Sequence, residues 1–113
     1  MLYYRGLHLQ SATWIADSQL EAIKNAGCAA AATTGAAGTT VQINDLSTVT
    51  NPGTLKIVWP TTTTQDPCTA AAPTTKPACS ATVPTVAGVC VTWTEPGSAA
   101  NRTVGLTTYV GPP

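Results

Sequence analysis

The four cysteines, Cys28, Cys68, Cys79 and Cys90, are the residues whose type and spacing most clearly predict chemistry in this chain. None of them forms a C-x2-C pair, and the chain has a single histidine. Zinc sites need closely grouped ligands, so this spacing argues against a metal centre. An even number of separated cysteines instead indicates two disulfides formed in an oxidising compartment. We therefore predict no metal or cofactor site and an extracytoplasmic location.

The pairing of the cysteines stays open at this level, because four cysteines allow three connectivities. A bridge between Cys68 and Cys79 would close a local loop of about a dozen residues, worth roughly 3 kcal/mol in the chain-entropy picture. On that basis we predict the pairs Cys68–Cys79 and Cys28–Cys90. An alternative is that Cys90, which is out of phase with its apolar neighbours, points to the loop or to solvent.

Candidates for acid–base chemistry are few. His8 has no recoverable Ser–His–Asp neighbourhood, so we predict that it faces solvent or a partner rather than acting as a base. Asp17 and Glu21 are four residues apart and could form a carboxylate pair. They are better explained as part of the solvent-exposed face of a helix, with Lys24 three residues beyond Glu21. With no catalytic constellation in sight, we expect a protein that is not an enzyme.

Three tryptophans could in principle form a platform for stacking sugars. Trp59 and Trp93 are in phase with valine and isoleucine, which predicts a core position for both. Trp14 lies beside the apolar stripe of a predicted helix, which predicts exposure toward a neighbouring molecule. The triplet at 101–103 (NRT) matches an N-glycosylation acceptor, but it is better explained as part of a strand.

Length and charge narrow the class of protein further. A chain of 113 residues is the size of one domain. Five basic and five acidic residues balance, and only 9% of residues are charged. Such a chain has no electrostatic footprint for nucleic acid or anionic lipid. It also contains no run of 18 apolar residues, so this sequence predicts no membrane span.

One amphipathic helix is predicted over residues 2–26, because apolar residues recur there at spacings of three and four. Gly27 follows where a left-handed C-terminal cap would stand. A helix of about 37 Å is long for this domain. We therefore expect one end to protrude or to pack against a partner. The apolar stripe comprises Leu2, Ala12, Ile15, Ala16, Leu20, Ile23 and Ala26, and the opposite side carries Asp17, Glu21, Lys24 and Asn25.

After a predicted loop at 28–40, alternating segments bounded by turn signals predict a small antiparallel sheet. Its strands are expected at 41–46, 54–59, 88–95 and 101–110, with the last two forming a hairpin. The predicted inward residues are Leu55, Ile57, Trp59, Val89, Val91, Trp93, Val104, Leu106, Thr108 and Val110.

The stretch at 60–83 is a low-complexity segment rich in threonine and proline. It holds almost nothing apolar larger than alanine, so its own burial cannot offset the entropy of ordering it. We predict a surface loop that is stapled rather than packed.

Two stretches resemble a known family. The segment SATWIADSQLEAIKNAG resembles the helix that precedes the head in minor pilins of the PilV type. The closing VCVTWTEPGSAANRTVGLTTYVGPP resembles the PilV and GspI-like ending, in which two strands complete the sheet. The resemblance covers about residues 10–27 and 88–111. It implies an α+β pilin-like fold, with residues 1–27 as the C-terminal half of the pilin helix and 28–113 as the globular head.

The resemblance also implies a function. Such a chain would be a non-catalytic minor pilin or pseudopilin, a subunit at the tip or base of a filament in a type IV pilus or a related secretion system. Its membrane-embedded half-helix, leader and assembly glutamate would lie upstream of this sequence, anchoring it in the inner membrane before assembly. An extracellular adhesin that presents the Thr/Pro loop is the alternative. The predicted surface for partner pilins is Leu2, Tyr3, Tyr4, Leu7 and Trp14.

Overall fold

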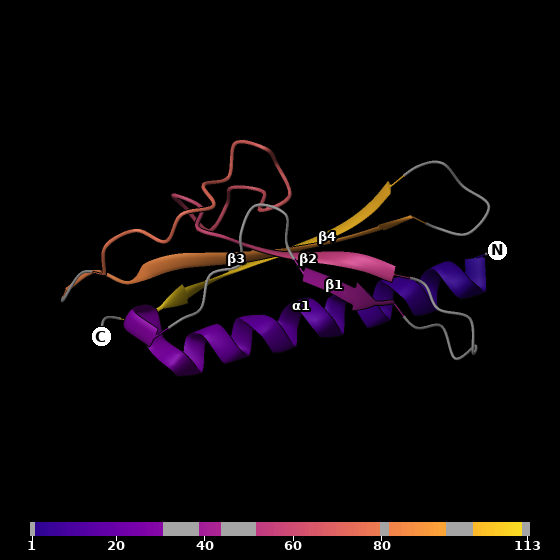
Figure 1. Cartoon of the computed structure of the whole chain (residues 1–113), viewed down its shortest axis with the longest axis horizontal. Helices are drawn as coiled ribbons and strands as arrows, with labels where there is room; N and C mark the ends of the chain where they lie inside the picture. The colour runs from indigo at the N-terminus through magenta and orange to yellow at the C-terminus, as the bar shows by residue number, and fades with distance from the viewer. Residues whose placement is uncertain (1, 31–38, 44–51, 80–81, 95–100, 112–113) are drawn as a thin grey trace.

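The computed structural model is a two-layer α+β fold in which one helix lies along a four-stranded antiparallel sheet (Figure 1). It describes residues 2–30, 39–43, 52–79, 82–94 and 101–111; the side chains of 2–7, 29–30, 39, 42 and 52 are excepted. The elements are α1 (Leu2–Ala30), β1 (Thr39–Gln42), β2 (Pro52–Val58), β3 (Thr85–Thr94) and β4 (Asn101–Val110).

Helix α1 packs against β3 and β4 through a stripe of small and medium-sized residues. Ala12 and Ala16 are fully buried, so the helix backbone lies close to the sheet. Leu20 and Ile23 continue the stripe at the next two turns, as the helical spacing predicts. Ile15 is half-buried at its edge. The predicted polar residues of the opposite side are exposed: Asp17, Glu21, Lys24 and Asn25.

The C-terminal end of the helix differs from the prediction. Gly27 does adopt the positive φ expected of glycine, with φ 81° and ψ 168°. The helix nevertheless resumes beyond this kink and continues to Ala30 instead of ending. Ala26, predicted in the apolar stripe, is exposed. The kink that follows turns the chain, and Cys28 is the next side chain to be buried.

The sheet has the order β1-β2-β3-β4, so each strand pairs with its neighbour in the chain. The predicted β3–β4 hairpin is confirmed, with a register that runs from Thr85↔Val110 to Thr94↔Asn101. The strand predicted at 41–46 is found at Thr39–Gln42, and residues 44–46 lie outside the described residues. Strand β3 begins three residues earlier than predicted, because its start pairs with the end of β4.

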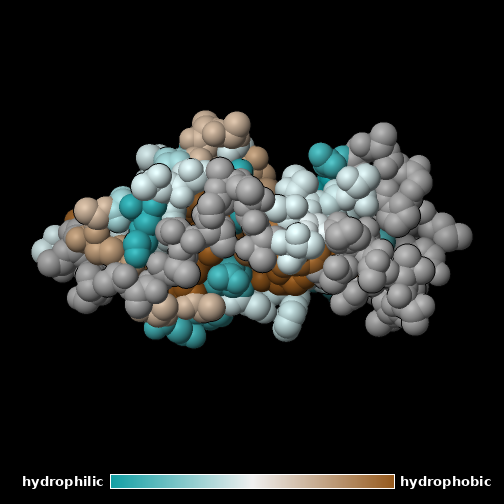
Figure 2. Space-filling model, viewed as in Figure 1, coloured by the Kyte–Doolittle hydropathy of each residue, from teal (hydrophilic) through white to brown (hydrophobic). Residues whose placement is uncertain are grey.

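The core lies between the helix and the inner face of the sheet. Trp59 and Trp93 are each 2% exposed, which confirms that both are core residues. Alternate residues of β2 and β3 point to this face, as the sequence period predicts. The half-buried Val104 and Leu106 of β4 pack at its margin. In the view of Figure 2, hydrophobic residues show along the middle of the molecule, and the most hydrophilic residues show in separate small patches over the surface.

The predicted protrusion of the helix stays a prediction. The molecule measures 48 × 25 × 21 Å along its principal axes. The helix is buried on one side from His8 onward, and the side chains before His8 are not described. Within the described residues no helix is long and apolar enough to cross a membrane.

The outer face of the sheet is covered by the segment at 60–79, which lies on the side opposite α1 (Figure 1). Pro67 is buried there against two glycines, Gly88 of β3 and Gly105 of β4. A Cβ added at Gly105 would lie 2.7 Å from the Cγ of Pro67. Glycine at this position is therefore required by close packing, which the sequence pattern alone did not indicate.

We expect Gly105→Ala to lower the free energy of unfolding by about 1–3 kcal/mol, because the new methyl group overpacks the contact with Pro67. Gly111→Ala is the matched control, since nothing lies within 4 Å of a Cβ at that position. Urea titrations of the two variants check this. Equal stability of both variants would show that the segment at 60–79 can shift to accommodate the new methyl group without loss of stability.

Ile23→Ala should lower the free energy of unfolding by about 2–5 kcal/mol, because it opens a cavity between α1 and the sheet. Lys24→Ala changes an exposed residue in the same turn and should stay within about 0.5 kcal/mol of the wild-type value. Thermal and chemical denaturation followed by circular dichroism measure both. A small effect of Ile23→Ala would mean that the helix is not anchored at this turn.

Candidate functional site

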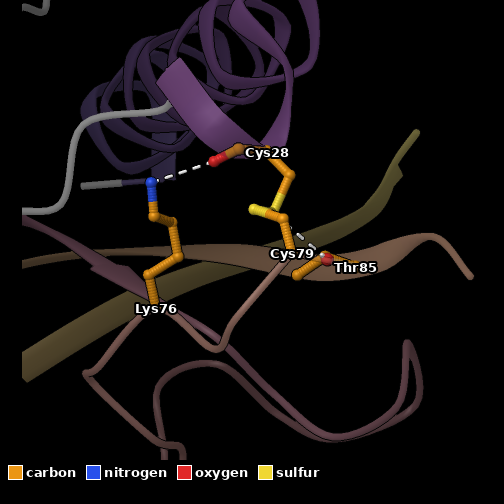
Figure 3. Close-up of a disulfide and its surroundings, with 4 residues drawn as sticks. All are labelled: Cys28, Lys76, Cys79 and Thr85. Atoms are coloured by element: carbon orange, nitrogen blue, oxygen red, sulfur yellow. Dashed lines mark hydrogen bonds between the residues drawn. A yellow bond between two sulfur atoms is a disulfide. The ribbon is translucent and has the colours of Figure 1, made fainter. Parts of the chain in front are cut away.

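The segment at 60–79, which covers the outer face of the sheet, is called the outer segment below. Two disulfides hold the layers together, and the first of them joins the helix to the end of this outer segment. Cys28 of α1 is bonded to Cys79, with the two Cα atoms 5.9 Å apart. The Cys28 sulfur also lies 3.3 Å from the hydroxyl oxygen of Thr85, at the start of β3 (Figure 3). Helix, outer segment and sheet thus meet at one point of the molecule.

Lys76 reinforces the same junction. Its Nζ donates a hydrogen bond to the carbonyl oxygen of Cys28 at 2.9 Å (Figure 3). Carbonyl groups at a helix end lack partners within the helix, and a cation there also complements the helix dipole. The lysine therefore caps the helix from a segment 48 positions away in the sequence. Sequence reasoning missed this role, because no local spacing links the two residues.

The second disulfide, Cys68–Cys90, fastens the outer segment to the middle of β3. Cys90 alternates with the inward-facing valines, so it points to the outer face of the sheet. The Asp66 carboxylate accepts a hydrogen bond from the backbone N–H of Cys68 at 2.9 Å, which turns the chain at that point. Further along the face, the Thr107 hydroxyl donates to the carbonyl oxygen of Thr63 at 2.8 Å.

The predicted pairs Cys68–Cys79 and Cys28–Cys90 are wrong; no free cysteine remains among the described residues. The segment does not close on itself but crosses the sheet, which carries its two cysteines to different partners. Cys68 lies above β3, and Cys79 returns to the helix end. The alternative that Cys90 points to the loop is the one that the structure bears out. The two bridges also indicate that the chain matures in an oxidising, extracytoplasmic environment.

The prediction for the outer segment is accordingly half right. It is stapled, but it is also packed: Pro67 and Ala72 are buried, and the backbone N–H of Trp59 donates to the carbonyl oxygen of Pro73 at 2.7 Å. Its staples anchor it to the helix and the sheet instead of closing a loop within it.

The disulfides close chain separations of 51 and 22 residues. Replacing either pair by serines should therefore destabilise the protein by about 3–4 kcal/mol in the chain-entropy picture, measured by denaturant titration. A peptide map made under non-reducing conditions, with a protease that cleaves after alanine and valine, should recover both pairs. A peptide that links Cys68 to Cys79 would contradict this connectivity.

The predicted exposure of His8 is wrong, since its side chain is only 1% exposed. His8 stands four residues before Ala12 and eight before Ala16, which extends the buried stripe by about one turn. The three-and-four spacing used for the other helix residues would have found it. The structure brings no three metal-ligating side chains together within the part of the chain that it describes.

The remaining candidates fall on two surfaces. Trp14 is 70% exposed on α1, as predicted. The side chains of Leu2, Tyr3, Tyr4 and Leu7, the rest of the predicted partner surface, lie outside the described residues. Asp17 and Glu21 line a groove between α1 and β4 of about 240 Å³, together with Leu20, Lys24, Leu106, Thr107 and Thr108.

A second groove, of about 400 Å³, lies between the outer segment and the start of β3. Its walls include Trp59, Val83 and four prolines, and no charged residue lines it. The indole N–H of Trp59 is buried and has no hydrogen-bond partner. The tryptophans therefore do not form a platform: Trp59 and Trp93 are core residues, and Trp14 is exposed by itself.

Comparison of the chain with models of protein families, with curated proteins and with solved structures finds no match.

Proposed function

We propose that this chain is the head of a minor pilin or pseudopilin, a structural subunit that assembles with other pilins into a type IV pilus-like filament. The proposal depends on one observation above all: α1 buries one side against its own sheet and leaves the large aromatic side chain of Trp14 on the other side. A helix with a surplus apolar side chain facing away from its own core is suited to packing against another helix.

The energetics support an interface at Trp14. Burying a tryptophan removes about 150–250 Å² from water. Trp14 is 70% exposed, so about 100–180 Å² remains to be buried, which at about 25 cal/mol per Å² is roughly 3–4 kcal/mol before the costs of association. By helical spacing, Leu7 lies seven residues before Trp14 and Tyr3 four before Leu7, so we expect all three on one helix face. Association through this face would require no change in the head.

The junction at Cys28 also suits a subunit whose helix enters a filament. The disulfide to Cys79 and the hydrogen bond from Lys76 fix the end of the helix to the head at two points. With these two attachments, we expect the head to move together with its helix. That property serves assembly and resistance to pulling, and it contributes nothing to turnover of a substrate.

We expect Trp14→Ala in the full-length protein to reduce filament formation at least about tenfold, because an anchor worth more than about 1.4 kcal/mol is lost. Electron microscopy of the organism that encodes the chain, with co-purification of partner pilins, measures the effect. The stability of the isolated chain should not change, since Trp14 is exposed. Val83→Ala, a change at a second exposed apolar residue, is the control.

An adhesin is the second candidate, and the uncharged groove beside Val83 favours it. In that case the segment at 60–79 would be the presented surface, and the filament would be only its carrier or would be absent. The same variants separate the two functions. Normal filaments in Trp14→Ala would refute the structural role, and loss of surface binding in Val83→Ala with normal filaments would support the adhesin.

A further inference from the structure

The two edges of the sheet differ in length and sequence. Strand β1 at one edge has four residues, whereas β4 at the other edge has ten. Among the residues that the structure describes, β4 pairs only with β3, over its full length. The edge of β4 that faces away from β3 therefore presents a row of backbone N–H and C=O groups along about 33 Å.

Strand β4 also lacks the usual protection of an edge. Natural edge strands are shortened, bulged, or carry proline and several charges. The sequence NRTVGLTTYV has no proline, one charged residue, and a pairing with β3 that has no bulge. Its β-branched residues favour the extended conformation. An unprotected edge of this length is suited to a second strand.

The face of β4 that points toward α1 is incompletely covered. Val104 and Leu106 face the core but are only half-buried. Beside them runs the groove between α1 and β4, whose charged walls are Asp17, Glu21 and Lys24. The groove thus carries one net negative charge next to an apolar margin. Its occupant should add apolar surface and one cation on the helix side of the sheet.

We propose that the occupant is β4 of a second copy, so that two chains join their sheets edge to edge in an antiparallel pair. A twofold axis perpendicular to the sheet keeps both helices on the same side, and residues directly opposite each other must then face the same way. Centring the axis on Gly105 satisfies this condition and pairs nine residues of each strand, from Asn101 to Tyr109.

This register supplies what the edge lacks. Val104 lies opposite Leu106 of the second copy, and this contact occurs twice, which extends the core across the interface. Arg102 is the one charged residue of β4 and shares the helix side with these two. It lies opposite Thr108 of the second copy, in the groove with Asp17 and Glu21, where it would cancel the net negative charge. The neighbouring registers place Arg102 opposite Leu106 or Val110.

The dimer is measured on the chain in solution by sedimentation across a concentration series, and it does not depend on the filament proposal. We expect Arg102→Glu to weaken it at least about tenfold, because two symmetric attractions become repulsions. Lys56→Glu makes the same charge change away from the edge and should have no effect. Adding Asp17→Lys and Glu21→Lys to Arg102→Glu should restore the dimer.

Hydrogen exchange provides a second readout, because amide protons of β4 that do not bond to β3 should become protected as the concentration rises. A thermal melt confirms that each variant is folded. A chain that stays monomeric at about 1 mM would overturn the proposal. So would a dimer that Arg102→Glu leaves intact, or one without added protection in β4. None of these outcomes bears on Trp14.

Discussion

A sheet with one helix has two faces to cover, and the outer face of this sheet is covered by a segment that cannot order itself. The segment at 60–79 is rich in threonine and proline and offers little apolar area, so it depends on attachments to the rest of the fold. Its two disulfides supply these attachments, one to the middle of β3 and one to the end of α1. One of these points, the bridge at Cys68, lies next to Pro67 and holds it against Gly105.

The parts of the fold that follow from periodicity were predictable. The three-and-four spacing of α1 and the alternation of β2, β3 and β4 each report which side of an element is apolar, and the antiparallel sheet and its core follow from them. His8 shows the limit of using residue type in place of spacing. Its chemistry suggested exposure, but its position four residues before Ala12 placed it in the buried stripe.

The candidate sites were less predictable, because they depend on contacts between distant parts of the chain. The pairing of the cysteines depends on the path of the outer segment, and loop entropy favoured the local pair over the one that forms. Lys76 reaches the carbonyl group of Cys28 for the same reason. The best signal was the phase of Cys90 in its strand: it excluded the inner face, where α1 lies, and left the outer segment as the partner.

The positions of the helix and of the segment at 60–79 explain where the exposed surfaces of the described residues lie. The helix covers most of the inner face, and the segment at 60–79 covers the outer face. Among the residues that the structure describes, the helix side that carries Trp14 and the backbone edge of β4 are two surfaces that neither layer covers. These two surfaces differ in kind. A helix face is recognised through its side chains, whereas a strand edge is recognised through its backbone groups, and a slip of one residue there turns every side chain to the other face. In the filament proposed above, a subunit would use the first for neighbours along the filament and the second for one fixed partner. The disulfide of Cys28 and the hydrogen bond from Lys76 attach the helix that carries the first surface to the sheet and segment that carry the second.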